Sequence, residues 1–224
     1  MATNNAINLS AQGIPYYNGA GTFSGLDGST AGFVLTSTGT GAAPSFQASS
    51  GVWTLIQSQT ASNQASVDFT SGITSSYKLF KLYITGLQCV VSGGSYVQIL
   101  CSTDGGSSYD TGANYSYNTQ YYGSSAVQDW SRATSATYIK WLHNAIPSSL
   151  TSTDTGSSEI LITGLSSAAQ YKQFRCISST NVGSDMYEYN SGGSYNSATA
   201  VNAIRIIHST GNMYAGVFSL YGLT

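Results

Sequence analysis

From about residue 53 onward, apolar and polar side chains alternate along the chain with a period of two. In the stretch YKLFKLYITGL, Phe80, Leu82 and Ile84 fall on one face, and SYVQILCS repeats the alternation over residues 95–102. Alternation of this kind predicts a β-strand with one buried face. The same reasoning predicts further strands at residues 137–142, 158–165, 170–178, 200–208 and 214–223.

Short segments rich in Gly, Ser, Asn and Asp separate these strands, and no stretch has apolar residues at helical spacing. We therefore expect residues 51–224 to form one all-β domain, an antiparallel β-sandwich that is jelly-roll-like. Three strands end in Gly-Leu, in YITGL, LITGL and SLYGL. Their glycines, Gly86, Gly164 and Gly222, are expected where the backbone needs a positive φ or a close approach.

Residues 1–50 have a different character. They carry one charged side chain, Asp27, and their apolar residues are too sparse to enclose a core. Disordered segments usually have a high net charge and few aromatic residues, whereas this segment has the opposite character. Burial against neighbouring copies of the chain is the better interpretation. We expect an extended segment for attachment and subunit contact, with four residues at the oligomer interface: Val34, Leu35, Pro44 and Phe46.

The low charge of the chain excludes some partners. Charged residues make up 7% of the sequence, against about 25% in ordinary soluble domains. The formal net charge is -2 and the seven Lys and Arg residues form no cluster, which argues against nucleic acid. The sequence contains no run of about 18 apolar residues and therefore does not predict insertion into a membrane. The N-terminus lacks the features of a secretory signal, so we expect assembly in a cytosol.

Residue types suited to catalysis or metal binding are sparse. Cys89, Cys101 and Cys176 are an odd number without CxxC spacing, which predicts buried free thiols rather than disulfides or a zinc site. The acidic residues show no spacing that singles out a catalytic pair. His143 and His208 end predicted strands, and no nucleophile motif accompanies them. The sequence therefore predicts a protein that is not an enzyme, with no catalytic residue, metal or cofactor.

One short motif has a defined local shape. The stretch STDGGSSY, residues 102–109, resembles the Asp-box hairpin of sialidases and other β-propellers, with Ser108 and Tyr109 in place of its usual threonine and tryptophan. An aspartate in this position caps its own turn by accepting backbone N–H groups. Since the motif occurs once, we interpret Asp104 as a turn residue rather than a catalytic or metal-binding one.

Two segments combine aromatic residues with amides and carboxylates, and we expect both to be polar loops. They are DTGANYSYNTQYYGSSAVQDW at 110–130 and MYEYNSGGSYN at 186–196. Flat aromatic faces beside amide and carboxylate groups match the apolar C–H patches and hydroxyls of a sugar. The candidate contacts to a glycan or other receptor are Tyr121, Tyr122, Asp129, Trp130 and Tyr195.

The other tyrosines of these segments have two interpretations. Tyr115, Tyr117, Tyr187 and Tyr189 alternate with polar residues, as strand residues do when they pack on a sheet face or at a subunit contact. Recognition of a ligand by exposed rings would give the same sequence. The alternation alone does not choose between packing and recognition.

The stretch GFVLTSTGTGAAPSFQASSGVWTLI resembles a string found in tail fibres and related appendage proteins of bacteriophages and prophages, and the resemblance extends over most of the chain from about residue 30. Similar features are SQTASNQASVDFTSGITSSYKLFKLYITGL, the STDGGSSY hairpin and the closing AIRIIHSTGNMYAGVFSLYGLT. The matching positions of the string are Gly32, Val34, Leu35, Thr36, Ser37, Gly39, Gly41, Pro44, Phe46 and Gln47.

This resemblance implies a structural protein of the virion, assembled in the host cytoplasm as a homotrimer. It implies that the N-terminal segment contacts other virion proteins and that the C-terminal β-domain faces outward. Two functions are compatible with it. The β-domain attaches to a host-surface glycan, or the protein is a connector or decoration of the capsid or tail that binds no receptor. A chain of 224 residues without a repetitive shaft corresponds to a short fibre or appendage.

Overall fold

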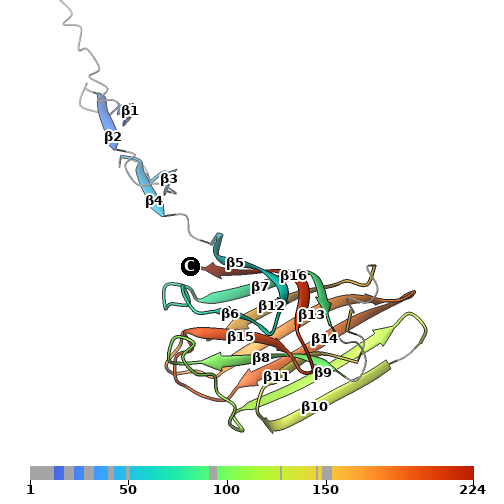
Figure 1. The fold of residues 1–224 in the computed structure, drawn as a ribbon. Coiled ribbons are helices and arrows are strands. Elements are labelled where there is room, and N and C mark those ends of the chain that lie inside the picture. The colour runs from blue at the N-terminus through green and yellow to red at the C-terminus, as the bar shows by residue number, and fades with distance from the viewer. Residues whose placement is uncertain are drawn as a thin grey trace, which may run out of the picture. The chain divides into compact units, whose positions relative to one another are not determined.

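The structure is a computed structural model that describes residues 13–17, 23–27, 33–39, 43–48, 51–90, 95–126, 128–144, 146–147 and 153–224. These residues form strands and connecting turns, with no helix in the described part of the chain. Contacts between residues divide the chain into two units, Met1–Val52 and Trp53–Thr224. Figure 1 shows the order of the strands.

The first unit contains two antiparallel β-hairpins. Their strands are β1 (Gly13–Tyr17) with β2 (Phe23–Asp27), and β3 (Phe33–Thr36) with β4 (Ser45–Ala48). The segment that the sequence predicts to be extended thus folds back on itself. Two predicted interface residues, Leu35 and Phe46, lie opposite each other in the β3–β4 register, and Pro44 immediately precedes β4.

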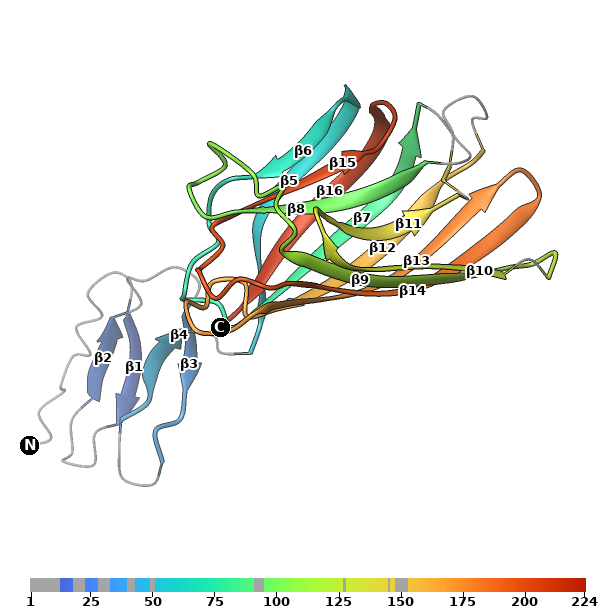
Figure 2. The ribbon, with the colours of Figure 1, turned by 90° about the horizontal axis from the view of Figure 1, so that it is seen from below.

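The second unit consists of two antiparallel sheets, seen as two layers in Figure 2. The eight-stranded sheet has the order β10 (Gln128–Ala136), β9 (Tyr115–Gly123), β14 (Asp185–Tyr195), β13 (Lys172–Val182), β12 (Gly156–Thr163), β7 (Leu79–Cys89), β16 (Met213–Leu223) and β5 (Trp53–Gln64). The four-stranded sheet has the order β11 (Ile139–His143), β8 (Tyr96–Ser102), β15 (Ala203–His208) and β6 (Ser66–Phe69). The predicted all-β sandwich is confirmed.

The strand pairs are nested in the manner of a jelly roll. Strands β5 and β7 both pair with β16, β6 and β8 both pair with β15, and β9 pairs with β14. Early strands therefore pair with late ones, and the chain passes from one sheet to the other between them. The hairpin of β12 and β13 extends the large sheet between β7 and β14.

The core fills the space between the two sheets. The predicted inward residues Phe80, Leu82 and Ile84 of β7 are fully buried, as is Trp141 of β11. Burial of one such side chain contributes about 1.5–3 kcal/mol to folding, and this hydrophobic term holds the layers together. The indole Nε1 of Trp141 donates a hydrogen bond to Ser158 Oγ at 3.4 Å, so the largest core side chain also has a polar partner.

The three Gly-Leu positions have the geometry that the sequence predicts. Gly86 and Gly164 have φ values of +64° and +70°. Gly222 lies inside β16, where an added Cβ would come within 2.4 Å of the ring of Tyr77. Two of the glycines thus provide a positive φ, and the third provides room for a close approach.

The sequence did not predict every strand. The segments expected to be polar loops are instead strands β9, β10 and β14, and the prediction of loops there is wrong. In β9 and β14, most tyrosines alternate with polar residues because these tyrosines face the core, whereas Tyr122 faces outward with most of the polar side chains. Strands β5 and β6 were also not among the strands predicted.

Candidate functional site

The inner faces of β9 and β14 hold most of the tyrosines that the sequence singled out. Tyr121 and Tyr195 are only 6% and 4% exposed. The rings of Tyr195 and Tyr115 pack with their centroids 4.8 Å apart, and the Tyr195 hydroxyl donates to Asp110 Oδ2 at 2.8 Å. Burial and this hydrogen bond raise the pKa of Tyr195 to about 12. Tyr121 and Tyr195 are therefore core residues, and their expected role as receptor contacts is corrected.

The remaining inner tyrosines also pack within the sandwich. Tyr115 and Tyr189 are buried, and the Tyr189 hydroxyl donates to the His143 carbonyl oxygen at 3.0 Å. Tyr187 is half-buried, with its ring centroid 5.5 Å from that of Tyr121. Tyr117 stacks at 6.1 Å on Tyr138. Of the two interpretations of these tyrosines, packing is the one that the structure supports.

The outer face of the eight-stranded sheet carries a row of side chains that crosses six strands. Strand register places these residues side by side in the order Trp130, Gln120, Asn190, Ile177, Glu159 and Tyr83. We call this set the Trp130 row. Its aromatic residues lie at the two ends, and amide, aliphatic and carboxylate groups lie between them. Directly opposed side chains in antiparallel strands are about 4.5–5.5 Å apart at Cβ, so the row is continuous.

Two hollows lie on this outer face and share Gln120 and Asn190. The first hollow, of about 750 Å³, is lined by residues of β9, β10, β13 and β14. The polar ones are Ser116, Asn118, Gln120, Arg132, Thr134, Gln173, Asn190 and Ser194, and the others are Tyr117, Ala133, Phe174, Gly192 and Gly193. The second hollow, of about 540 Å³, is lined by Tyr83, Thr85, Gln120, Tyr122, Ser157, Glu159, Ile177, Ser179, Glu188 and Asn190. Together they make an open surface with amides at its centre.

Of the predicted receptor contacts, two lie on this face. Trp130 is 61% exposed at the edge strand β10, and Tyr122 is 55% exposed and lines the second hollow. Asp129 points to the other side of β10. Its Oδ1 accepts a hydrogen bond from the backbone N–H of Trp130 at 2.8 Å, and its Oδ2 accepts one from Asn144 at 2.9 Å. Asp129 therefore positions the strand that carries Trp130 instead of facing the hollows.

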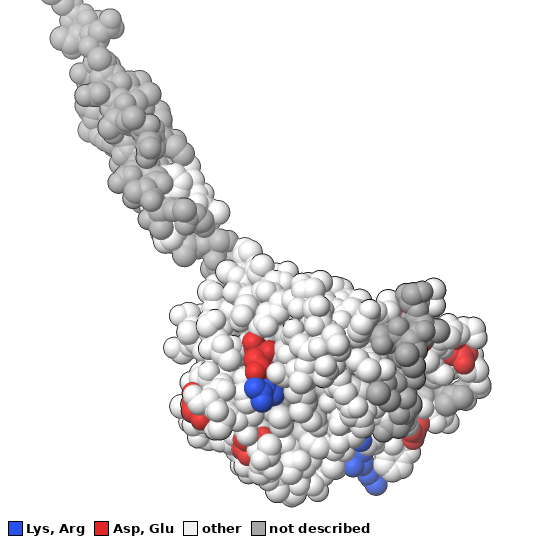
Figure 3. Space-filling view, in the orientation of Figure 1, with Lys and Arg blue, Asp and Glu red and all other residues white. Residues whose placement is uncertain are grey.

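Charged side chains are sparse on the outer face, and one oppositely charged pair is in contact there. Lys81 Nζ lies 3.3 Å from Glu159 Oε1 and 4.9 Å from the ring centroid of Trp53. Its hydrogen bond to Tyr83 and its contact with Glu159 raise the pKa of Lys81. The opposite layer is similar, since the face shown in Figure 3 has only scattered charged side chains. With so few charged side chains, such a surface is suited to hydrogen bonding, stacking and individual charged contacts rather than to binding through an extended basic patch.

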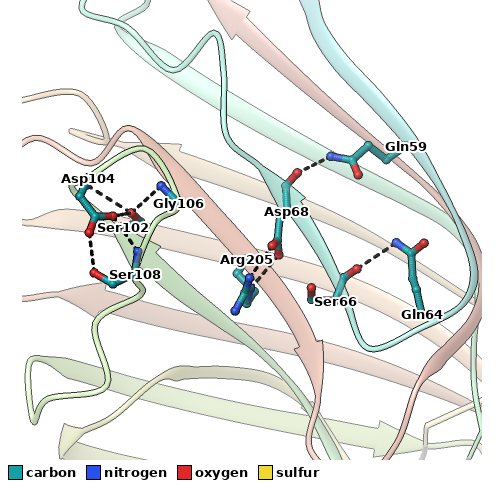
Figure 4. Close-up of polar contacts among 9 residues, drawn as sticks. All are labelled: Gln59, Gln64, Ser66, Asp68, Ser102, Asp104, Gly106, Ser108 and Arg205. Atoms are coloured by element: carbon teal, nitrogen blue, oxygen red, sulfur yellow. Dashed lines mark hydrogen bonds and ion pairs between the residues drawn. The ribbon is translucent and has the colours of Figure 1, made fainter.

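The turn at residues 102–109 is architectural (Figure 4). Asp104 Oδ1 accepts hydrogen bonds from Ser102 Oγ at 2.7 Å and from the backbone N–H of Ser108 at 2.9 Å, and Oδ2 accepts one from Ser108 Oγ at 2.5 Å. These hydrogen bonds, those from Ser108 above all, lower the pKa of Asp104 to about 2. The prediction that Asp104 caps its own turn is confirmed.

A cation–π contact and an ion pair fix the neighbouring strands. Arg205 of β15 donates to both carboxylate oxygens of Asp68 of β6, at 2.8 and 2.6 Å (Figure 4). Its guanidinium carbon also lies 4.0 Å from the ring centroid of Tyr109, at the end of the Asp104 turn. A bidentate pair of this kind adds geometric specificity. These residues stabilise the small sheet and are separate from the hollows.

The predicted interface residues are accessible within the chain. Val34 and Leu35 are 49% and 46% exposed, and Pro44 and Phe46 are half-buried. The three cysteines are free and buried, as the sequence predicts. Among the described residues, no three His, Cys, Asp or Glu side chains come together as a possible metal site. The same described residues contain no helix with the length and apolarity of a membrane span.

The sequence missed most of the Trp130 row. Ile177, Glu159 and Tyr83 lie in strands that it predicted, but nothing in the sequence places them beside Gln120 and Trp130. The signal for these three residues in the sequence was the alternation of inward and outward positions, or strand parity, because each of them lies at an outward position of its strand. Their alignment depends on the order and register of strands distant in the sequence, which parity does not give.

No family model matches this chain, and comparisons with curated proteins and with solved structures find no significant similarity.

Proposed function

We propose that this protein is a structural component of a bacteriophage virion, a short homotrimeric fibre or appendage whose β-sandwich attaches to a host-surface glycan. The virion assignment is supported by the resemblance of residues 32–56 and of the later segments to phage appendage proteins. In this proposal the N-terminal hairpins provide contacts to other copies and to other virion proteins. The proposed role is binding and not catalysis.

The observation that carries the glycan assignment is the Trp130 row with its two adjoining hollows. Sugars present hydroxyls beside apolar C–H patches, so amides and carboxylates can bind the hydroxyls while aromatic faces pack on the patches. The outer face offers Gln120 and Asn190 at its centre, and exposed rings of Trp130 and Tyr122 beside them. The open, shallow form of the surface is suited to a segment of a polysaccharide chain.

The test is binding of the full-length oligomer to host cells and to their isolated surface polysaccharide, for wild type and for Trp130→Ala and Tyr122→Ala. Both side chains are exposed, so their removal is expected to leave folding intact. Each variant is expected to bind about two- to tenfold more weakly, because a stacked ring contributes on the order of 0.5–1.5 kcal/mol. The matched control is Tyr171→Ala, which removes a ring of 56% exposure outside both hollows.

Equal loss of binding in the Tyr171 control would contradict the assignment of the site. Absence of binding by a correctly assembled wild-type oligomer would contradict glycan attachment and favour the second candidate, a connector or decoration protein. The burial of Tyr121 and Tyr195 favours that alternative, because it removes two of the expected receptor contacts. In that case Trp130 and Tyr122 would be covered by another virion protein.

A further inference from the structure

The two hollows of the outer face differ in charge. Among the described residues that line the first hollow, Arg132 is the one charged side chain, and no carboxylate is present. The second hollow is lined by Glu159 and Glu188, with no Lys or Arg in its described lining. The site therefore has a cationic end and an anionic end, which meet at the two shared amides.

A second arginine stands beside the first hollow. Strand register places Arg132, Asn118, Gly192 and Arg175 side by side across β10, β9, β14 and β13. At about 4.8 Å per strand, the backbones at Arg132 and Arg175 are about 14 Å apart. Gly192 has no side chain to fill the space between them. The two arginines thus lie on either side of Asn118 and of the space left open at Gly192.

Neither arginine has a carboxylate partner among the described residues. The guanidinium carbon of Arg132 lies 4.9 Å from the ring centroid of Trp130, so the indole holds it by a cation–π contact. Arg175 is exposed, and the ion pairs of the described residues do not include it. On the same face, Lys81 is paired with Glu159. The positive charge at the first hollow is therefore available to a ligand.

We propose that the first hollow selects a sugar residue that carries a carboxylate, with the carboxylate bound by Arg132 and Arg175. This inference rests on the proposed function, because it names the class of glycan that the same face binds. A planar guanidinium can donate two parallel hydrogen bonds to a carboxylate. The amides of Asn118, Gln120 and Gln173 then bind the ring hydroxyls. Repulsion from Glu188 directs the acidic residue away from the second hollow.

The experiment measures binding of the full-length oligomer to immobilised polysaccharides. The acidic probes are polymannuronate, polygalacturonate and polysialic acid, and the neutral probes are dextran, mannan and galactan. The wild type is expected to bind at least one acidic polymer and to prefer it to every neutral one. Carboxyl reduction of the bound polymer, which converts each carboxylate to a neutral alcohol, is expected to lower its affinity at least about tenfold.

Two variants assign this selectivity to the arginines. Arg132→Gln and Arg175→Gln are each expected to weaken binding of the acidic polymer about tenfold or more, since a hydrogen bond between charged groups is lost. Lys78→Gln is the matched control, because it removes one positive charge from an exposed residue outside both hollows. Glu188→Gln is expected to keep or increase the affinity, because it removes a negative charge from the adjoining hollow.

The outcomes separate this inference from the proposed function. Binding to a neutral polymer that is equal to or tighter than binding to every acidic one would overturn the inference and leave glycan attachment standing. The inference would also be overturned if Arg132→Gln and Arg175→Gln did not reduce the preference for acidic polymers. The same holds if Lys78→Gln reduced that preference equally. If the assembled protein binds no probe and no host polysaccharide, both proposals fail.

Discussion

The Nε2 atom of His143 lies 3.5 Å from the Oδ2 atom of Asp129, on the inner side of the strand that carries Trp130. His143 is buried, and neither of its ring nitrogens has a hydrogen-bond partner among the described residues. The rings of Tyr121 and Tyr189 also pack against it, with centroids at 5.2 and 6.2 Å. Burial lowers the pKa of His143, and the nearby carboxylate opposes this effect only in part.

The first prediction is that the protein becomes less stable as the pH falls below about 6.5, the ordinary pKa of histidine. Burial also lowers the pKa of His208. Because both pKa values are lower in the folded state, the unfolded chain binds more protons in this range. The free energy of unfolding therefore decreases with falling pH, by at most about 1.4 kcal/mol per pH unit for each histidine. Thermal unfolding between pH 7.5 and 5 measures this decrease.

Replacement of one histidine separates its contribution. His143→Phe keeps an aromatic ring beside Tyr121 and removes the group that binds the proton. The variant is expected to lose less stability than the wild type between pH 7.5 and 5. The part of the loss that is due to His208 is expected to remain. The carboxylates act at lower pH, since the lowered pKa of Asp104 affects stability only below its ordinary value of 3.8. An unchanged pH dependence in His143→Phe would contradict this assignment.

The second prediction concerns Lys172, a lysine without solvent exposure at the start of β13. Its Nζ donates hydrogen bonds to three backbone carbonyl oxygens, those of Ser167 at 2.7 Å, Gln170 at 2.7 Å and Ser197 at 3.1 Å. Lys172→Met keeps most of the volume but leaves these carbonyls without their donor. We expect a loss of about 2–4 kcal/mol in the free energy of unfolding, measured by urea denaturation.

The control for Lys172 is Lys78→Met, which removes the same charge from an exposed side chain. Its free energy of unfolding is expected to stay within about 0.5 kcal/mol of the wild type. Equal effects of the two substitutions would show that the three carbonyl contacts do not stabilise the fold.

The sequence predicts the β-sandwich correctly because the buried face of a strand is visible in its own residues. The alternation of Phe80, Leu82 and Ile84 requires no knowledge of neighbouring strands. The tyrosine-rich strands β9 and β14 were missed for a chemical reason. Tyrosine is amphipathic, so Tyr121 in the core and Tyr122 on the surface are the same residue type, and composition does not separate buried from exposed positions.

The site was less predictable than the fold. Trp130 and Tyr122 were expected as surface contacts and are exposed, but Asp129 lies on the opposite side of β10 from Trp130 and accepts a hydrogen bond from Asn144. The hollow at Gly192 exists because β14 lies between β9 and β13. That arrangement follows from pairing between strands far apart in the sequence, so no local pattern contains it.

The third prediction compares two adjacent glycines of β14 on opposite faces. At Gly193, an added Cβ would come within 2.4 Å of Cγ2 of the buried Ile139. Gly193→Ala is therefore expected to destabilise the fold by about 1–3 kcal/mol in thermal or urea denaturation. At Gly192, the nearest atom to an added Cβ is the Phe174 carbonyl oxygen at 3.9 Å.

Gly192→Val is expected to leave stability unchanged or slightly higher, since valine favours strands more than glycine does. It is expected to weaken glycan binding, because its side chain occupies the first hollow. The pair thus separates stability from binding. A destabilised Gly192→Val, or a Gly193→Ala as stable as the wild type, would contradict the packing described for this strand.

The fourth prediction is that the native thiols are unreactive. Burial raises the pKa of Cys89 to about 12 and raises the pKa values of Cys101 and Cys176 as well. The reactive thiolate is therefore scarce near neutral pH, and the reagent has no access to it. Ellman's reagent at pH 8 is expected to modify no cysteine in the folded protein and all three in denaturant. Rapid modification of one cysteine before unfolding would contradict its burial.

The fifth prediction concerns the exposed apolar residues of the β3–β4 hairpin. Val34 and Leu35 are about half exposed in the isolated chain, and we propose that neighbouring copies cover them. Leu35→Asp would place a charge in that contact and is expected to dissociate the trimer, so that the average mass measured by light scattering falls. Proteolysis within residues 33–48 is expected to become faster. Gln170→Glu also adds one charge, on an exposed side chain of the second unit, and is expected to leave the trimer intact. A wild-type protein that is monomeric and still resists proteolysis in this segment would contradict the proposal, because the hairpin would then be ordered without its neighbours.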